Sequence, residues 1–437
     1  MTTASSERPS AFDAHDPPSM EALRTCVHCG ICLPQCPTFR VLGEEMDSPR
    51  GRVYLMRAAA EGRLDLTPTL ARHLDLCLGC RGCETACPSG VPFGELLEAS
   101  RAQLARRGIR APDTAHRTLS LALALFPHPR RLAPLMALAR FYQRSGIASL
   151  VRPLARLAPL RTLAAMDALL PRLGPSAGPL PELTPAIGPR RGRAGLLTGC
   201  VQRFVYADVN RDTVRLLAAA GYDVVAPRAQ ECCGALHLHA GRLDEYREMG
   251  ERLMVAFDPA LDVIVVNAAG CGSALKECAR WIPGDRAESF ARKVRDVSEV
   301  LHGADLPLRE LRATVAYHGA CHLAHGQRVR AEPLELLERI PGLRVVPLAD
   351  AELCCGSAGL YNLIEPEIAG ELGREKAERI RETGAAIAAS GNPGCLMQIA
   401  RWCRDLGVEV EVLHPVSLLA RALDERSPAR PRGATMT

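Results

Sequence analysis

The sequence predicts an α+β protein with an α-helical N-terminal unit, a basic helical linker and two duplicated α/β domains with parallel sheets. Three observations predict it. A run of four cysteines occurs twice before residue 90, arginine and proline are abundant in residues 101–193, and one pattern of strands, helices and cysteines occurs twice after residue 193. Strands that alternate with helices form parallel sheets covered by helices. The expected segments are 1–19 (disordered tail), 20–100, 101–193, 194–310, 311–425 and 426–437 (disordered tail).

The two N-terminal cysteine runs predict iron–sulfur clusters. Each run has the spacing Cys-x2-Cys-x2-Cys-x3-Cys-Pro. In two-cluster [4Fe–4S] ferredoxins, such a run gives three ligands to one cluster and its fourth cysteine to the other. We therefore expect a two-cluster ferredoxin unit with crossed ligation. The first [4Fe–4S] cluster is assigned to Cys26, Cys29, Cys32 and Cys87, and the second to Cys77, Cys80, Cys83 and Cys36.

Zinc is the alternative metal, because paired Cys-x2-Cys units also form tetrahedral zinc sites. Zinc accounts neither for the third cysteine at the same interval nor for the proline that closes both runs. A disulfide framework is disfavoured, because a chain of 437 residues buries a sufficient core without cross-links. The spacing therefore favours electron transfer over a zinc-binding scaffold.

Two helices are predicted between the runs. Ser48, followed by proline, is typical of a helix N-terminus, so a helix is expected over residues 50–61. A second helix is expected over residues 68–74. Arg50 and Arg52 are expected on the exposed surface of the first helix, with contact to the anionic clusters as the alternative.

Residues 101–193 carry the basic charge of the chain. Sixteen arginines and three acidic residues give this segment a net charge of +13, whereas the whole chain carries +5. Its composition predicts short amphipathic helices interrupted at prolines. These prolines are Pro127, Pro129, Pro134, Pro153 and Pro159. The segment is interpreted as a solvated linker or as a docking face for an acidic partner or an anionic membrane surface, while its few aromatic residues disfavour nucleic acid.

The C-terminal half is an internal duplication, because corresponding cysteines of its two copies are displaced by 121, 122 and 124 residues. In the first copy, a strand is expected to end at Thr198, further strands are expected over 223–226 and 263–266, and helices over 205–220 and after Ala240. In the second copy, strands are expected over 314–317, 344–346 and 385–389, and helices over 333–339 and 367–381.

The cysteines of each copy follow predicted strands, so they are expected to meet at the carboxyl edge of the sheet, where open α/β folds bind ligands. The glycine after each Cys-Cys pair lets backbone N–H groups approach a cluster. We expect one or two further iron–sulfur clusters here. The predicted ligands are Cys200, Cys232, Cys233 and Cys271 in the first copy, and Cys321, Cys354, Cys355 and Cys395 in the second.

Other cysteines and histidines are given smaller roles. Cys278 and Cys403 have no counterparts at matching positions and are expected to be buried structural thiols. The histidines near the predicted ligands are expected to be neighbours of the metal sites or surface residues rather than ligands. They are His28, His237, His239, His318 and His322.

Behind the two-cluster ferredoxin unit, the chain carries one cysteine pattern twice: a single Cys, then Cys-Cys-Gly about 30 residues later, then another Cys after a similar interval. This arrangement resembles the cysteine-rich CCG domains of heterodisulfide reductase and related flavin-linked dehydrogenase subunits. Within that group the sequence is most similar to the iron–sulfur subunits of glycolate oxidase, also called glycolate dehydrogenase. The stretches that carry the resemblance include Cys26-Val-His-Cys-Gly-Ile-Cys, Asp47-Ser-Pro-Arg-Gly-Arg-Val-Tyr, His73-Leu-Asp-Leu-Cys, Asn267-Ala-Ala-Gly-Cys-Gly and Leu353-Cys-Cys-Gly-Ser-Ala-Gly.

The resemblance implies an electron-transfer subunit of an oxidoreductase. Flavin-bearing partner subunits would oxidise glycolate to glyoxylate, and this subunit would relay the electrons to a quinone-type acceptor. The corresponding subunit of a lactate or anaerobic glycerol-3-phosphate dehydrogenase is the alternative within the group. Heterodisulfide reductase subunits complete each domain with a fifth thiolate in a Cys-x2-Cys, but here those positions hold Ala274 and Gln398. Five-cysteine ligation is therefore not expected.

Missing motifs also shape the prediction. The chain has no Gly-x-Gly-x-x-Gly after a strand and no P-loop, so no flavin or NAD is expected on it. No stretch reaches the ~18 apolar residues of a membrane span. The polar N-terminus does not resemble a signal peptide. We expect a cytoplasmic protein bound peripherally at the inner face of the membrane.

Overall fold

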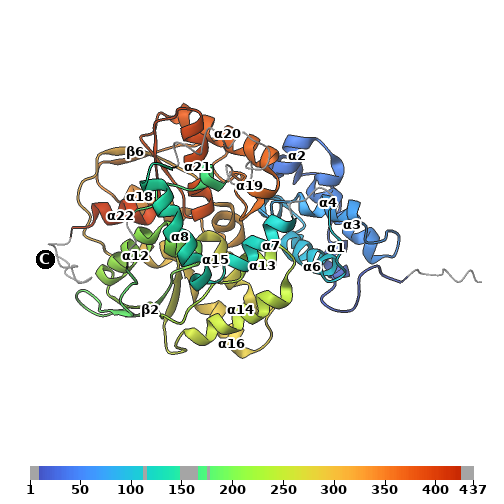
Figure 1. Cartoon of the computed structure of the whole chain (residues 1–437), viewed down its shortest axis with the longest axis horizontal. Coiled ribbons are helices and arrows are strands. Elements are labelled where there is room, and N and C mark those ends of the chain that lie inside the picture. The colour runs from blue at the N-terminus through green and yellow to red at the C-terminus, as the bar shows by residue number, and fades with distance from the viewer. Residues whose placement is uncertain (1–8, 112–115, 148–165, 175–177, 425–437) are drawn as a thin grey trace, which may run out of the picture.

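The computed structural model describes residues 9–111, 116–147, 166–174 and 178–424 (Figure 1). The helical N-terminal unit lies at one end of the molecule, and the two α/β domains lie together at the other. Helices of the linker cross the face of the α/β domains. The predicted fold class is confirmed, since both α/β domains contain parallel sheets covered by helices.

The N-terminal unit is built from short helices around the two cysteine runs. Ser48 caps α3, because its hydroxyl accepts a hydrogen bond from the Gly51 N–H at 3.0 Å. Gly51 has no room for a side chain, since an added Cβ would lie 1.9 Å from the carbonyl oxygen of Glu45. The helices are α1 (Met20–Arg24), η1 (Leu33–Gln35), α2 (Pro37–Leu42), η2 (Glu45–Asp47), α3 (Pro49–Ala60), α4 (Pro68–Asp75), α5 (Gly82–Ala86) and α6 (Phe93–Arg106).

The N-terminal segment differs from the expectation of a disordered tail over 1–19. Phe12 is buried in the core of the N-terminal unit, and the Asp13 N–H donates to the Gln103 side chain at 3.0 Å. Residues 9–19 are therefore packed, because an aromatic side chain anchors them, whereas residues 1–8 and 425–437 lie outside the described residues. The boundary expected at residue 100 also falls inside a helix, since α6 continues to Arg106.

The linker contains α7 (His116–Leu125) and α8 (Pro129–Arg144). The chain breaks at Pro127 and Pro129 as expected, but Pro134 lies inside α8. It is tolerated because the carbonyl that it leaves without a partner belongs to Arg130, on an exposed turn. Pro153 and Pro159 lie outside the described residues. Among the helices of the described ranges, none is both long and apolar enough to cross a membrane.

Copy 1 (residues 194–310) and the segment before it form a five-stranded sheet with the order β1-β3-β2-β4-β5. Only β1 is antiparallel to its neighbour. The strands are β1 (Leu183–Thr184), β2 (Gly192–Leu197), β3 (Tyr222–Val225), β4 (Val263–Val266) and β5 (Val294–Asp296). The helices are α11 (Val201–Val205), α12 (Ala207–Ala219), α13 (Ala235–His239), α14 (Leu243–Ala256), α15 (Ala269–Lys276), η4 (Cys278–Arg280), α16 (Asp285–Lys293) and α17 (Val297–His302).

Copy 2 (residues 311–425, described to 424) repeats this order in a wholly parallel sheet, β7-β6-β8-β9. The strands are β6 (Ala313–Tyr317), β7 (Leu343–Val346), β8 (Ile387–Ala389) and β9 (Glu411–Leu413). The helices are the π-helical turn η5 (His322–Gly326), α18 (Ala331–Glu338), α19 (Tyr361–Ile364), α20 (Pro366–Thr383), α21 (Pro393–Asp405) and α22 (Pro415–Ala422).

The two copies pack through equivalent helices. Helix α12 of copy 1 packs on α22 of copy 2, and α18 of copy 2 packs on α17 of copy 1. Helices α12 and α18 follow the first strand of their copies, and α17 and α22 follow the last. One apolar core therefore runs between the sheets, and it contains Leu196 of copy 1 and Val315 of copy 2.

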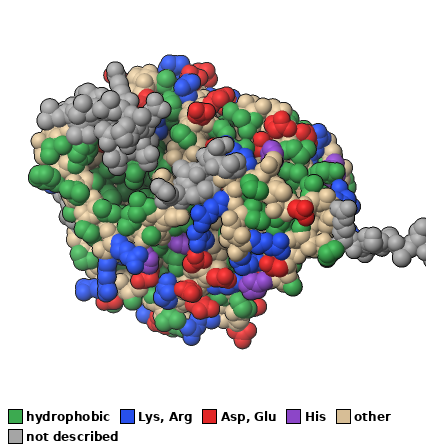
Figure 2. Space-filling view, turned by 45° about the vertical axis from the view of Figure 1, so that its right-hand side comes forward, with side chains coloured by type: hydrophobic (Ala, Val, Ile, Leu, Met, Phe, Trp, Pro, Cys, Tyr) green, Lys and Arg blue, Asp and Glu red, His purple; other side chains and the backbone are tan. Residues whose placement is uncertain are grey.

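The N-terminal unit is fastened to both copies. Arg81 forms a two-pronged ion pair with Glu277 of copy 1, with N–O distances of 2.6 and 3.0 Å. The Tyr361 hydroxyl of copy 2 donates to the carbonyl oxygen of Leu76 at 3.0 Å. Basic and acidic side chains are interspersed on the face shown in Figure 2. The cysteine-bearing end of the N-terminal unit is thus held against both α/β domains.

Candidate metal centres

The first cysteine run (run 1, Cys26–Cys36) brings three thiols into a tight loop. His28 and Gly30 adopt positive φ angles of 54° and 84°, which turn the backbone around the thiols. Burial, together with the smaller effect of the charges of Cys26 and Cys29, raises the pKa of Cys32 to about 11. Cys29 is exposed, so this loop is the most accessible of the thiol groups.

The second run (run 2, Cys77–Cys87) is deeper. Burial raises the pKa of Cys83, and the charges of Cys80, Cys77 and Cys36 add to the effect. Cys36 of run 1 therefore lies within electrostatic reach of the run 2 thiols. The Gly79 N–H donates to the sulfur of Cys77 at 3.4 Å, which is the kind of bond that stabilises a thiolate ligand.

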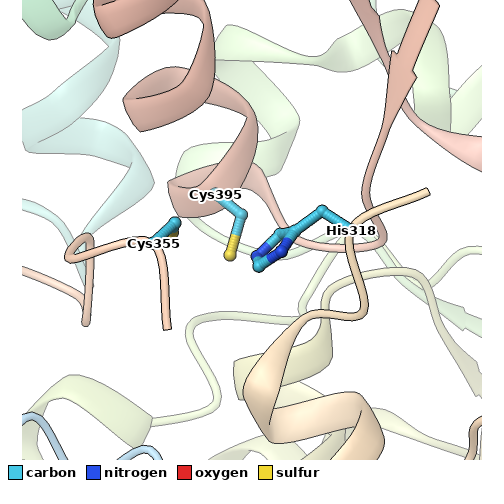
Figure 3. A group of neighbouring side chains, drawn as sticks. All are labelled: His318, Cys355 and Cys395. Carbon is cyan, nitrogen blue, oxygen red and sulfur yellow. The ribbon is translucent and has the colours of Figure 1, made fainter. Parts of the chain in front are cut away.

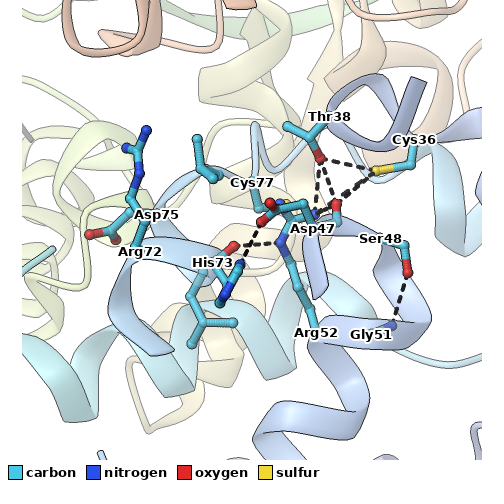
Figure 4. A network of polar contacts seen from close by, with 12 residues as sticks. Cys36, Thr38, Asp47, Ser48, Gly51, Arg52, Arg72, His73, Asp75 and Cys77 are labelled. Carbon is cyan, nitrogen blue, oxygen red and sulfur yellow. Dashed lines mark hydrogen bonds and ion pairs between the residues drawn. The ribbon is translucent and has the colours of Figure 1, made fainter. Parts of the chain in front are cut away.

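A buried arginine stands beside Cys36 (Figure 4). Arg52 is fully buried, and its Nη1 lies 3.9 Å from the Cys36 sulfur and 3.1 Å from Thr38 Oγ1. Its Nε donates to the His73 carbonyl at 2.6 Å. Asp47 accepts from Arg52 through both its backbone and its side chain. The expectation that Arg52 is exposed is therefore wrong, because α2, η2 and α4 close over it.

The four predicted ligands of copy 1 form one group, site 1. The sulfurs of Cys200 and Cys232 are 3.6 Å apart, and the Gly234 N–H donates to the Cys232 sulfur at 3.4 Å. Cys233 interacts directly with Cys271, at the start of α15. Gly234 has a φ of 77°, which turns the backbone so that its N–H faces the sulfur. Arg203 lies near Cys200 and Cys232, although burial lowers its pKa.

The four predicted ligands of copy 2 form the equivalent group, site 2. Contact with Cys355 and then burial raise the pKa of Cys395, and contact with Cys321 raises that of Cys354. Asn392 donates to the Cys395 sulfur at 3.5 Å. His318 joins this group, with ligand atoms of His318, Cys355 and Cys395 all within 4.8 Å of one another (Figure 3). Burial lowers the pKa of His318, which favours its neutral form.

Sites 1 and 2 lie where the fold predicts ligand binding. In each sheet the first and third strands of the copy are neighbours, β2 with β4 and β6 with β8. The chain order therefore reverses between them, and the crevice at that reversal is the usual binding position in open α/β folds. Cys200 and Cys271 follow β2 and β4, and Cys321 and Cys395 follow β6 and β8. Strand order alone thus brings distant cysteines together.

Run 2 and site 2 are in direct contact. Burial raises the pKa of Cys80, and the charge of Cys321 is the next cause. Both thiols border an apolar cluster that contains Leu76 and Leu78 of the N-terminal unit and Cys354 of copy 2. The backbone oxygen of Gly79 lies 3.0 Å from His322 Nε2. Run 2 and site 2 are therefore neighbours across a packed interface between the N-terminal unit and copy 2.

Cys278, Cys403 and the histidines lie outside the predicted ligand sets. Cys278 and Cys403 are buried in the same apolar clusters as thiols of sites 1 and 2, but no charge of a site thiol contributes to their raised pKa values. His322 is buried beside His239, with ring centroids 5.0 Å apart.

The sequence did not single out Arg203 or Lys376, which lie near sites 1 and 2. A usable signal for Lys376 was its rarity, since the chain has only three lysines.

The donor set fits iron–sulfur clusters. Sixteen of the eighteen cysteines belong to the two runs and to sites 1 and 2, and none is joined in a disulfide within the described residues. Thiolates are the ligands that these clusters require, and N–H groups of Gly79 and Gly234 point at sulfurs.

Comparisons with known proteins agree with this arrangement. The family model described as "4Fe-4S dicluster domain" matches residues 22–91, and the "Cysteine-rich domain" model matches residues 194–276 and 315–400. The model described as "Glycolate oxidase iron-sulfur subunit, linker region" matches residues 112–170. Three separate parts of the chain thus match models in the order that the structure shows.

Relatives that align with nearly the whole chain have the same family assignment. A probable glycolate oxidase iron-sulfur subunit of Bacillus subtilis is 36% identical over 93% of this chain and 95% of its own length. The glycolate oxidase iron-sulfur subunit of Escherichia coli is 31% identical over 92% of this chain and 95% of its own length. Lactate utilization protein A of Oceanobacillus iheyensis is 32% identical but matches only 52% of this chain. From its two-run N-terminal unit to its duplicated cysteine-rich domains, the chain belongs to the family of glycolate oxidase iron–sulfur subunits.

Proposed function

We propose that this chain is the iron–sulfur electron-transfer subunit of a multi-subunit glycolate dehydrogenase. It takes electrons from a flavin-bearing partner that oxidises glycolate to glyoxylate, and it delivers them to a quinone-type acceptor. The observation that carries the proposal is the contact of run 2 with site 2, where Cys80 and Cys321 border one buried cluster. Iron–sulfur clusters supply one-electron transfer with little rearrangement of their ligands.

The proposed ligands are those expected from the spacing. Cys36 belongs with Cys77, Cys80 and Cys83, and the charge of Cys36 on Cys83 supports this crossed assignment. Cys87 then completes the group of Cys26, Cys29 and Cys32. Sites 1 and 2 hold further clusters on their four cysteines each.

Run 1 is the proposed contact point for a redox partner. Val27 and Ile31 flank Cys29, and their side chains are 68% and 54% exposed. Exposed apolar residues around an accessible thiol suit a protein interface, whereas Cys80 of run 2 borders a buried cluster shared with copy 2. Glycolate is favoured over lactate as the substrate of the complex, because the linker model and the full-length relatives both carry the glycolate oxidase name.

Glycolate should bleach the visible absorption of the chain only when its partners are present. We expect anaerobically purified protein to be brown, and its colour to fade when glycolate is added to the complex with flavin-bearing subunits. The isolated chain is the control and should not respond. Stronger bleaching by lactate or glycerol 3-phosphate would favour the alternative substrates, and a colourless protein that contains zinc would contradict the proposal.

Removing one thiol of either Cys-Cys pair should interrupt electron delivery. We expect Cys233→Ala and Cys355→Ala to leave the complex assembled and its flavin reducible by glycolate, but to reduce transfer to a quinone analogue at least tenfold. Cys403→Ala is the matched control, because Cys403 is buried in the same apolar cluster as Cys355 and Cys395, yet burial alone raises its pKa and no charge of a site 2 thiol contributes. Acceptor reduction at the wild-type rate in both variants would show that these thiols are structural.

The buried charge of Arg52 should raise the reduction potential of the run 2 cluster. We expect Arg52→Gln to lower this potential by roughly 50–150 mV, since a unit charge about 4 Å away contributes at most about 4 kcal/mol at an effective dielectric constant of about 20. Arg52→Lys should restore most of the shift, because it keeps the charge. Redox titration followed by electron paramagnetic resonance measures the potential. Arg57→Gln on the same helix is the control, and an equal shift there would contradict a local effect of Arg52.

Helix α8 is the proposed contact with an anionic membrane surface, in keeping with a cytoplasmic protein at the inner face. Leu135, Leu138 and Phe141 are exposed on it, while Leu132 and Met136 pack against the protein. Exposed apolar side chains beside arginines are typical of helices that lie on membranes.

Reversing the charge at the start of α8 should weaken that contact. We expect Arg130→Glu with Arg131→Glu to release the protein from anionic vesicles at low salt, with its visible spectrum unchanged. Co-sedimentation with vesicles measures binding, and Arg292→Glu, an exposed arginine of copy 1, is the control. Unchanged sedimentation of the double variant would favour a simple linker.

A further inference from the structure

The two cysteine-rich copies place different side chains around their thiols. His318 precedes Cys321 by three residues, and the residue that precedes Cys200 by three is Leu197. Both side chains are buried, at 1% exposure each. The copies share a fold and a cysteine pattern, yet only copy 2 places a nitrogen donor at this position. Site 2 is therefore not a repeat of site 1 in its chemistry.

The imidazole of His318 is not satisfied by a hydrogen bond of normal length. Within the described part of the chain, neither ring nitrogen has a partner at that distance, and the Cys355 thiol and the Ala351 backbone are the polar groups that act on the ring. Its backbone is fixed, because the His318 N–H donates to the Ala389 carbonyl at 2.8 Å. A buried polar group without a partner is costly, so such groups normally meet a ligand, a metal or water. A ring nitrogen lies within 4.8 Å of the Cys355 and Cys395 sulfurs, and Figure 3 shows the ring directed toward Cys395.

In copy 2, the position at which heterodisulfide reductase subunits carry a fifth thiol holds Gln398, whose side chain is already hydrogen-bonded to the protein. Gln398 is fully buried, its Nε2 donates to the Ala369 carbonyl at 2.8 Å, and its Oε1 accepts from Asn362 at 3.2 Å. Both ends of the amide are thus occupied by the protein. His318, arriving from the loop after β6, is the unengaged donor beside Cys355 and Cys395.

A second difference between the copies supports this assignment. Gly234 and Gly356 follow the Cys-Cys pairs and pack on α14 and α20, where Met249 and Leu372 occupy equivalent contact positions. Four residues further along each helix, copy 1 has Leu253 and copy 2 has Lys376. Lys376 is 3% exposed, donates to the Asp350 carbonyl, and lies within electrostatic reach of Cys354 and Cys355. Two buried nitrogen groups thus face site 2 where site 1 has leucine.

We propose that His318 is a nitrogen ligand of the metal centre at site 2, completing a set with Cys321, Cys354, Cys355 and Cys395, while site 1 is ligated by thiolates alone. This inference rests on the proposed function, in which site 2 holds an iron–sulfur centre. A neutral imidazole adds no negative charge to the ligand set, and histidine ligation raises the potential of iron–sulfur centres relative to cysteine ligation. Site 2 then has a higher reduction potential than an all-thiolate version of the same site.

The test uses full-length protein purified anaerobically with its clusters and labelled with ¹⁵N-histidine. Electron–nuclear double resonance on the reduced protein should show coupling to a histidine nitrogen. His318→Cys should keep the iron content, remove that coupling and shift the potential of one centre downward. His318→Leu, which copies the residue of site 1, should also lose the coupling. His414→Gln is the matched control, because His414 is equally buried in copy 2 but both of its ring nitrogens have protein partners.

The outcomes separate the two proposals. Iron above the about eight atoms of the two N-terminal clusters, with no histidine coupling in the wild type, overturns the role of His318 and leaves the proposed function standing. Coupling that persists in His318→Cys overturns it too. Only about eight iron atoms in the wild type would overturn both the site 2 centre and its histidine ligand. Coupling lost in His318→Cys but retained in His414→Gln is the expected result.

Discussion

The burial of thiolate charge is the constraint on which this structure depends. A cluster brings several negative ligands into the protein interior, where an uncompensated charge is expensive. Each of the four thiol groups has its own cation. Arg50 lies near Cys29 and Cys32, Arg52 beside Cys36, Arg203 near Cys200, and Lys376 near Cys354.

These cations are held in place by oxygen atoms. Arg52 donates to backbone oxygens of Asp47 and His73, Lys376 donates to that of Asp350, and Arg203 donates to the carbonyl of Gln230 at 3.2 Å. Anchoring by neutral carbonyls leaves much of the positive charge of Lys376 and Arg203 available to the sulfurs. Arg52 and Arg50 are in addition paired with carboxylates, those of Asp47 at 3.4 Å and of Glu45 at 2.7 Å. The helices of the N-terminal unit and the loops of the α/β domains are thus arranged around fixed pairs of opposite charge.

The large features of the fold and the grouping of cysteines in the α/β domains were predictable from local spacing. Cysteine intervals defined the two runs, and the 121 to 124 residue displacement defined the duplication. Strand ends then placed Cys200 and Cys271 together, because parallel strands of one sheet share a carboxyl edge. These inferences needed only sequence distances and the chirality of α/β folds. The cysteine groups follow from them directly.

The remaining features depend on contacts between distant residues. Arg52 is buried because Thr38, Asp47 and His73 come from separate helices that close around it. Phe12 orders the segment before α1 by entering a core formed by later helices. The sequence places His318 near predicted ligands, but only the fold brings its ring beside Cys355 and Cys395. Helix and strand propensities and hydrophobic periodicity contain no information on such contacts between residues that are distant in the sequence.

The contact between the Leu76 carbonyl and the Tyr361 hydroxyl also bears on how the protein is made. These residues are 285 positions apart, so run 2 emerges from the ribosome long before the segment that covers it. At about 5–20 residues per second, the interval is roughly 15–60 s. During that time the Cys80 side of run 2 has no cover from copy 2. Once copy 2 has folded, Cys80 borders a buried cluster shared with copy 2, so this side of the run is more accessible before copy 2 is made than after.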